Sequence, residues 1–211
     1  MIEIIQKGGP MTWLILASSL LATIIFLERV LNLHRAQIKS ADFLTGILTI
    51  LKRQNIVEAI SMCDETPGPV ARVVRAAILR HDEGRDSIVR AVEVAGLDEI
   101  PRLEKNLPLL STLAQITPLM GLLVTVLGMM QMLIAIEQRT PLVHAGDLAV
   151  GIWQALVSTA TGIAVAILAY AGHSFLVGRV ESIVLDMERA AGEIVTHFTG
   201  TPSRAQGKNK P

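Results

Sequence analysis

The stretch that decides the fold is residues 107–136, which reads LPLLSTLAQITPLMGLLVTVLGMMQMLIAI and contains no Asp, Glu, Lys or Arg. Residues 10–27 and 148–178 are likewise free of formal charge. A helix needs about 20 apolar residues to cross a bilayer, whereas a soluble core helix shows polar residues at most turns. The sequence therefore predicts an all-α integral membrane protein with three transmembrane helices, the second and third long and extended into a cytoplasmic helical domain.

The composition excludes several classes of protein. Of the 211 residues 51% are hydrophobic, the mean hydropathy is +0.49, and 19 basic residues balance 19 acidic ones. Such a chain is too apolar for a disordered protein and too neutral for a nucleic-acid binder. The single Cys63 excludes an internal disulfide framework, and the sequence has no HExxH, GxGxxG or GxxxxGK[ST] motif. We therefore expect no enzyme activity, no catalytic residue, no metal site and no cofactor.

The distribution of basic residues predicts the orientation in the membrane. Residues 34–106 hold eleven Lys and Arg, whereas Arg139 is the only basic residue of 137–147 and Lys7 the only one before the first span. The positive-inside rule then places the N-terminus outside, and residues 34–106 and the C-terminus in the cytoplasm. A cleaved signal peptide is the alternative at the N-terminus, but the apolar stretch ends in Glu28-Arg29 rather than at a small-residue cleavage site.

These observations predict eight segments along the chain. They are a periplasmic N-terminus (1–9), transmembrane helix 1 (10–33), a cytoplasmic helical domain (34–106), transmembrane helix 2 (107–136), a periplasmic loop (137–147), transmembrane helix 3 (148–178), a cytoplasmic helical extension (179–198) and a disordered tail (199–211). Within the cytoplasmic domain, apolar residues at helical spacing predict helices over 41–53, 70–80 and 87–99. Residues 64–69 and Gly84 predict the breaks between them, and the last helix is expected to run nearly continuously into the second span.

Small residues recur at helical spacing in the second and third spans. The second span carries Ala114, Pro118, Gly121, Thr125 and Gly128, and the third carries Gly151, Ala155, Thr159, Gly162 and Ala166. A neighbouring polar stripe on the third span consists of Gln154, Ser158 and Thr161. Two interpretations stay open. Small residues allow close helix packing with hydroxyls bonded to their own helix, whereas two paired stripes also fit a hydroxyl-lined path for an ion or proton.

Neither long span contains a carboxylate. Glu28 and Arg29 lie at the end of the first span, where they read as membrane-boundary charges. A proton carrier in hydrocarbon needs a titratable group, and such a group inside a membrane is costly enough to mark function. If protons move through this protein, we therefore expect the carboxylate to come from another chain.

The span sequences resemble a known family. Residues 113–130, LAQITPLMGLLVTVLGMM, and 151–167, GIWQALVSTATGIAVAI, are similar to the second- and third-span signatures of the MotA/TolQ/ExbB proton-channel family. Residues 13–33, which end in LERVLNL, resemble the family's first span. Three spans rather than four favour the ExbB/TolQ branch.

The resemblance implies a bacterial inner-membrane ring, typically a homopentamer, whose second and third spans line a pore. It implies an ExbD- or TolR-like single-span partner that supplies the transmembrane Asp, and a TonB- or TolA-like protein that receives the force. The family's pore threonines correspond to Thr125 and Thr159. The function implied is that of an ExbB-type stator for outer-membrane transport, with a TolQ-type subunit for envelope maintenance or a non-conducting membrane scaffold as alternatives.

Three positions depart from the family pattern. Val124 stands where Gly often precedes the first threonine, Gln154 takes an acidic position, and Leu168 replaces the usual Pro. We expect a narrower helix contact at Val124, no titration at Gln154 and a straighter third span at Leu168.

Overall fold

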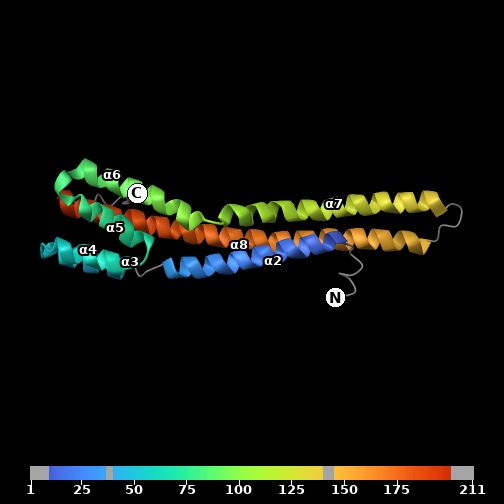
Figure 1. Cartoon of the computed structure of the whole chain (residues 1–211), viewed down its shortest axis with the longest axis horizontal. Coiled ribbons are helices and arrows are strands. Elements are labelled where there is room, and N and C mark those ends of the chain that lie inside the picture. The colour runs from blue at the N-terminus through green and yellow to red at the C-terminus, as the bar shows by residue number, and fades with distance from the viewer. Residues whose placement is uncertain (1–9, 37–39, 140–144, 201–211) are drawn as a thin grey trace, which may run out of the picture. The chain divides into compact units, whose positions relative to one another are not determined.

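The computed structural model describes residues 10–36, 40–139 and 145–200, and almost all of them are helical, with no strand among them. The elements in chain order are α2 (Pro10–Ala36), α3 (Ser40–Lys52), α4 (Ile56–Glu65), α5 (Pro69–Leu79), the short 3-10 helix η1 (His81–Glu83), α6 (Arg85–Glu104), α7 (Leu107–Arg139) and α8 (Ala145–Thr199) (Figure 1). Three helical segments are long and apolar enough to cross a membrane: Trp13–His34, Arg85–Ile134 and Gly151–Thr199. The structure thus confirms the all-α class and the three long apolar helices. The expected N-terminus at 1–9, the centre of the loop at 140–144 and the tail from 201 lie outside the described residues.

The chain forms two compact units. The first contains Met1–Arg29 and Asn106–Leu176, and the second contains Val30–Lys105 and Val177–Pro211. The helices α2 and α8 contribute residues to both. All three charge-free stretches fall in the first unit apart from Val177 and Gly178.

The first unit exposes large apolar side chains along every one of its helices. A lipid environment accepts such side chains, whereas a soluble protein rarely leaves so many in water. Its buried residues include Ile15, Leu110 and Leu176. The exposed set includes Trp13, Leu20, Leu119, Leu133, Trp153, Ile167 and Leu168.

The second unit has an ordinary apolar core between α3, α4, α5, α6 and the end of α8. Its breaks lie where the sequence predicts them. Gly68 and Gly84 precede α5 and α6 with φ of 141° and 86°, a region that side chains with a Cβ rarely adopt. Pro69 begins α5, where its missing N–H leaves no helical bond unmade. The largest fully buried side chains are Ile47, Leu51, Val73, Val74, Ile78, Ile88 and Ile194.

The run from α6 into α7 is interrupted at Lys105 and Asn106. Asn106 has φ 64°, which Asn tolerates better than most residues, and its Nδ2 donates to Glu28 Oε2 at 3.0 Å. Neither of the two nearby prolines causes the break. Pro101 is inside α6 and Pro108 is the second residue of α7. The break therefore depends on a left-handed Asn held by a side chain of α2.

Candidate functional site

The helices α7 and α8 approach each other most closely at two glycines. A Cβ on Gly162 would lie 3.1 Å from both Gly121 Cα and the carbonyl oxygen of Thr117. A Cβ on Gly121 would lie 3.2 Å from the carbonyl oxygen of Ser158 and from Thr159 Cα. Any larger residue at either position must push the two backbones apart, so the small residues permit this approach.

The hydroxyls of Thr125 and Thr159 meet next to this contact. The two side-chain oxygens contact each other directly across the interface of α7 and α8. Thr125 Oγ1 also lies 3.2 Å from the carbonyl oxygen of Gly121 and 3.1 Å from that of Ala155. Thr159 Oγ1 lies 3.1 Å from the same Gly121 oxygen. Four oxygens from two helices therefore surround one point.

The number of hydrogens limits what this cluster can do at one time. Each threonine hydroxyl has a single hydrogen to donate, and the two carbonyl oxygens can only accept. Two hydrogens therefore serve the four oxygen–oxygen contacts around Thr125 and Thr159. Each hydroxyl has more acceptors within reach than it can use, so its hydrogen can change acceptor by rotation about a single bond.

The remaining polar residues of the third span bond along their own helix. Ser158 is fully buried and donates to the carbonyl oxygen of Gln154 at 3.0 Å. Thr161 is half-buried and donates to the carbonyl oxygen of Val157 at 2.8 Å. Gln154 is itself half-buried. The structure thus brings Thr125 and Thr159 together, whereas Ser158 and Thr161 make bonds within α8.

The other expected packing residues extend the same interface. A Cβ on Gly128 would lie 3.5 Å from Ala155 Cβ, and one on Gly151 would lie 3.6 Å from Met132 Cβ. Both distances are ordinary van der Waals contacts, so these glycines are less tightly enclosed than Gly121 and Gly162. Pro118 lies inside α7 and is half-buried.

The two boundary charges differ in their surroundings. Glu28 accepts the hydrogen bond from Asn106 described above. Arg29 is only 3% exposed, which the sequence does not anticipate for a residue at a membrane boundary. A buried guanidinium is costly unless it is partnered, so Arg29 is a structural element of the first unit rather than a solvated surface charge.

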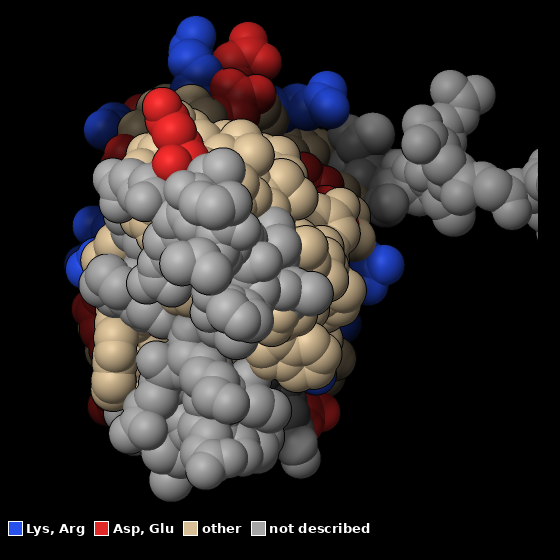
Figure 2. Space-filling model, turned by 90° about the vertical axis from the view of Figure 1, so that its right-hand side faces the viewer, with Lys and Arg blue, Asp and Glu red and all other residues tan. Residues whose placement is uncertain are grey.

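The described part of this unit offers no cluster for a metal ion. No group of three or more His, Cys, Asp and Glu residues comes together anywhere in the described ranges. Figure 2 views the chain from the end where α7 and α8 are joined, and the described atoms nearest the viewer are mainly uncharged. The site therefore consists of neutral hydroxyls and carbonyls, which can donate and accept hydrogen bonds but do not titrate at ordinary pH.

Comparison with known proteins explains this combination of apolar helices and neutral hydroxyls. The sequence profile of the MotA/TolQ/ExbB proton channel family matches residues 65–189, more than half of the chain. This chain belongs to the MotA/TolQ/ExbB proton channel family. The matched region contains both Thr125 and Thr159.

Relatives in this family carry the names of both ExbB and TolQ. The chain is 31% identical over 164 residues to a putative biopolymer transport protein, ExbB-like 3, of Synechocystis, covering 77% of this chain and 78% of that protein. It is 32% identical to the Tol-Pal system protein TolQ of Pseudomonas aeruginosa, covering 81% and 78%. It is 24% identical to a putative ExbB homolog of Methanothermobacter thermautotrophicus, covering 89% of this chain and 66% of that protein.

The departures from the MotA/TolQ/ExbB pattern lie at different depths in the structure. Val124 is buried and directly precedes Thr125. Leu168 is 74% exposed on α8, which continues without a break through this position. Leu168 therefore lies on an exposed face of α8, whereas Val124 is part of the packed interior.

Sequence reasoning missed one residue of this interface. Thr117 is 1% exposed, donates to the carbonyl oxygen of Leu113 at 2.6 Å, and places its own carbonyl against Gly162. Residues three and four apart share one face of a helix. Thr117 lies four residues before Gly121, so extending the small-residue stripe by this rule would have found it.

Proposed function

We propose that this chain is the ring-forming stator subunit of a proton-driven motor in the bacterial inner membrane. In this proposal an ExbD-like single-span partner completes the channel, and the complex converts proton motive force into mechanical work on a TonB-like protein for outer-membrane transport. Membership of the MotA/TolQ/ExbB family and the three long apolar helices support it. The homo-oligomer, typically a pentamer in this family, is part of the proposal.

The observation that carries the proposal is the Thr125–Thr159 pair in a membrane interface without a carboxylate. A hydroxyl that can change acceptor is suited to a carboxylate that must gain and lose a proton. When the partner's Asp is ionised, a threonine hydroxyl donates to it, because hydrogen bonds to charged acceptors are stronger than those to carbonyls. When the Asp is protonated, the hydroxyl returns to the carbonyl of Gly121 or Ala155.

The remaining polar residues take supporting places in this proposal. Gln154 and Thr161 are half-buried polar side chains of α8 that can face the pore, and Gln154 can hydrogen-bond without titrating. Ser158 supports the pathway from inside the packed interface, where its hydroxyl bonds to its own helix. The helices α7 and α8 stay close enough for the hydroxyls to meet because of five packing residues: Pro118, Gly121, Gly128, Gly151 and Gly162. Residues 34–106 and 179–198 lie in the cytoplasm, and 137–147 in the periplasm.

The energetics require several protons per working stroke. One elementary charge that crosses 100 mV releases about 2.3 kcal/mol. A single proton therefore supplies little work, so the ring and its partner must couple successive transfers.

A TolQ-type role is the second candidate. The specific observation in its favour is the 32% identity with the Tol-Pal system protein of Pseudomonas aeruginosa over 81% of this chain. The two roles differ in the output protein and not in the α7–α8 site. A short neighbouring reading frame with one span and an early Asp is expected in both cases, beside TonB-dependent transporter genes in the first and Tol-Pal genes in the second.

The proposal is tested by complementation in a strain that lacks this chain. Thr159→Ala removes one hydroxyl and should abolish growth that depends on the partner, while Thr159→Ser should restore most of it. Membrane levels of both variants are measured by immunoblot. Full growth with Thr159→Ala at normal protein levels would leave the non-conducting scaffold as the better account.

A further inference from the structure

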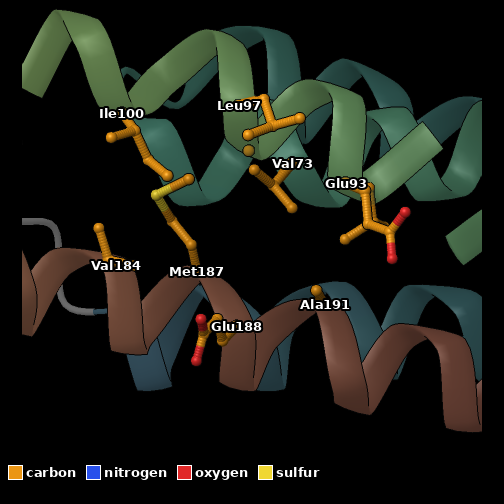
Figure 3. Close-up of a pocket in the computed structure, with 10 residues that line it drawn as sticks. Val73, Glu93, Leu97, Ile100, Val184, Met187, Glu188 and Ala191 are labelled. Carbon is orange, nitrogen blue, oxygen red and sulfur yellow. The ribbon is translucent and has the colours of Figure 1, made fainter. Parts of the chain in front are cut away.

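A half-open apolar cavity of about 340 Å³ lies in the second unit between α6 and α8, with α5 behind it. We call it the α6–α8 groove. Figure 3 shows Met187 reaching from α8 toward Ile100 of α6, with Val73 of α5 behind them. Leu97 lines the groove and is 68% exposed, and its neighbour on α6, Val94, is 60% exposed. Outside a membrane, such an apolar surface needs a covering partner.

Gly96 lines this groove, and no contact within the described chain requires a glycine at this position. Gly96 lies in the interior of α6, and a Cβ built on it would meet nothing within 4 Å. Glycine is less favourable than alanine in a helix interior. What sets Gly96 apart from other open glycines is that it lines the apolar groove, so its missing side chain leaves room there for a side chain of another segment.

Two carboxylates at the groove indicate the charge of that segment. Glu93 and Glu188 both line it, one from α6 and one from α8, and both are exposed (Figure 3). Within the described residues neither makes an ion pair or a side-chain hydrogen bond. A segment that complements the α6–α8 groove therefore has an apolar side chain with basic residues beside it.

The same unit carries a corner with these complementary properties. Val57, at the start of α4, is 76% exposed, the highest value among the exposed large apolar side chains of the described residues. Lys52 is the last residue of α3 and Arg53 follows it in the link to α4. Both are exposed and make no ion pair or side-chain hydrogen bond with any described residue. We call these three residues the α3–α4 corner.

The corner of a chain cannot fill the groove of the same chain. In Figure 1 α6 and the α3–α4 pair lie on opposite sides of the second unit's part of α8. Two complementary surfaces on different sides of one molecule make head-to-tail contacts, which generate a ring where the rotation closes. The basic residues 201–211 are a less suitable occupant, because they contain no large apolar side chain.

We propose that the α6–α8 groove of one copy receives the α3–α4 corner of the next copy, with Val57 against Gly96 and Leu97 and with Lys52 and Arg53 near Glu93 and Glu188. The inference rests on the homo-oligomer of the proposed function and names the contact that links its cytoplasmic parts. It does not depend on whether the ring conducts protons.

Crosslinking between two differently tagged copies tests this contact. In a Cys63→Ala background, one copy carries Val57→Cys and the other Gly96→Cys, both full-length and co-expressed with the single-span partner in native membranes. A short bis-maleimide should yield the heterodimer. Two control variants replace one site each. Leu79→Cys takes the place of Val57→Cys, because Leu79 is also an exposed apolar residue. Gly192→Cys takes the place of Gly96→Cys, because Gly192 is an exposed glycine of α8 with open space around it. The control pairs should yield about tenfold less product.

Charge reversal gives an independent measurement. Lys52→Glu with Arg53→Glu should lower the crosslink yield about tenfold, and adding Glu93→Lys with Glu188→Lys to the other copy should restore it. Yields equal to the controls in an oligomer intact by native mass spectrometry would overturn this contact and leave the proposed function standing. A crosslink from Gly96→Cys to the single-span partner would overturn it too. Monomers alone would overturn both the contact and the ring.

Discussion

Thr159 donates its hydroxyl to the carbonyl oxygen of Gly121 at 3.1 Å, across the interface between α7 and α8. The bond forms only because Gly121 and Gly162 let the two backbones approach so closely. The contact between the Thr125 and Thr159 hydroxyls therefore depends on the absence of a Cβ atom at Gly121 and at Gly162. Enlarging either glycine should disturb the hydroxyls even though it changes no polar group.

Gly162→Ala tests this dependence. Its Cβ would lie 3.1 Å from Gly121 Cα, a backbone atom that cannot move away cheaply. We expect the free energy of unfolding in detergent to fall by about 1–3 kcal/mol, as in overpacked cores. Growth that depends on the single-span partner should decrease as well.

Gly178→Ala is the matched control, since a Cβ there meets nothing within 4 Å. Alanine is the better helix former, so this variant should be neutral or more stable by about 0.5–1 kcal/mol. Equal stability losses in the two variants would show that the close approach at Gly162 has no special role.

Glu99→Gln tests a buried ion pair in the second unit. Glu99 is 4% exposed. Its Oε2 forms an ion pair with Nη2 of Arg72 in α5 at 2.9 Å, and its Oε1 forms one with Nη1 of Arg102 in its own helix at 3.0 Å. Removing the charge leaves both bonds weaker, but the two guanidiniums are half-exposed and solvent screens them. We expect a loss of about 1–2 kcal/mol in thermal unfolding of the full chain.

The exposed Glu104 of α6 provides the control for this measurement. Glu104→Gln should change the unfolding free energy by less than about 0.5 kcal/mol. If Glu99→Gln behaves in the same way, the carboxylate does not hold α5 against α6.

Cys63 should react slowly with thiol reagents. Burial, and next to it the negative charge of Asp64, raises the pKa of this thiol from 9.0 to about 11. Since the thiolate is the reactive form, maleimide labelling at pH 8 should be about a hundredfold slower than for an ordinary exposed cysteine. The rate should keep rising above pH 9, and a plateau near pH 9 would contradict the raised pKa.

The same shift has a consequence for stability. The Cys63 thiol keeps its proton to a higher pH in the folded chain than in the unfolded chain. The contribution of this thiol to the free energy of unfolding is therefore fully present below about pH 9. Stability is then lost as the pH rises from about 9 toward the folded pKa of about 11. Cys63→Ala should remove this part of the alkaline decline in unfolding free energy.

Local sequence signals predict much of the second unit. The turn expected over 64–69 and the break at Gly84 depend on Pro and on glycine dihedrals, which act within a few residues. The structure has α4 ending at Glu65, α5 beginning at Pro69 and α6 beginning at Arg85. The interruption at Asn106 was harder to predict, because its side-chain bond to Glu28 joins residues 78 positions apart.

Burial of charge shows the same limit. Glu99 and Arg29 look like surface residues in the sequence, yet they are 4% and 3% exposed. The burial of Glu99 depends on Arg72, which only tertiary packing of α5 on α6 brings near. In the spans, periodicity predicts small faces on α7 and α8 but not which hydroxyl meets which carbonyl.

The most direct test of the central claim is proton flux through the reconstituted complex of this chain with its single-span partner. The double variant Thr125→Val, Thr159→Val keeps the shape of both side chains and removes both hydroxyls. A hydrogen bond to a charged group contributes about 1.5–3 kcal/mol, so flux under an imposed gradient should fall at least about tenfold. Thr125→Ser with Thr159→Ser should keep most of it. Flux at the wild-type rate through an intact ring of the valine variant would contradict the account.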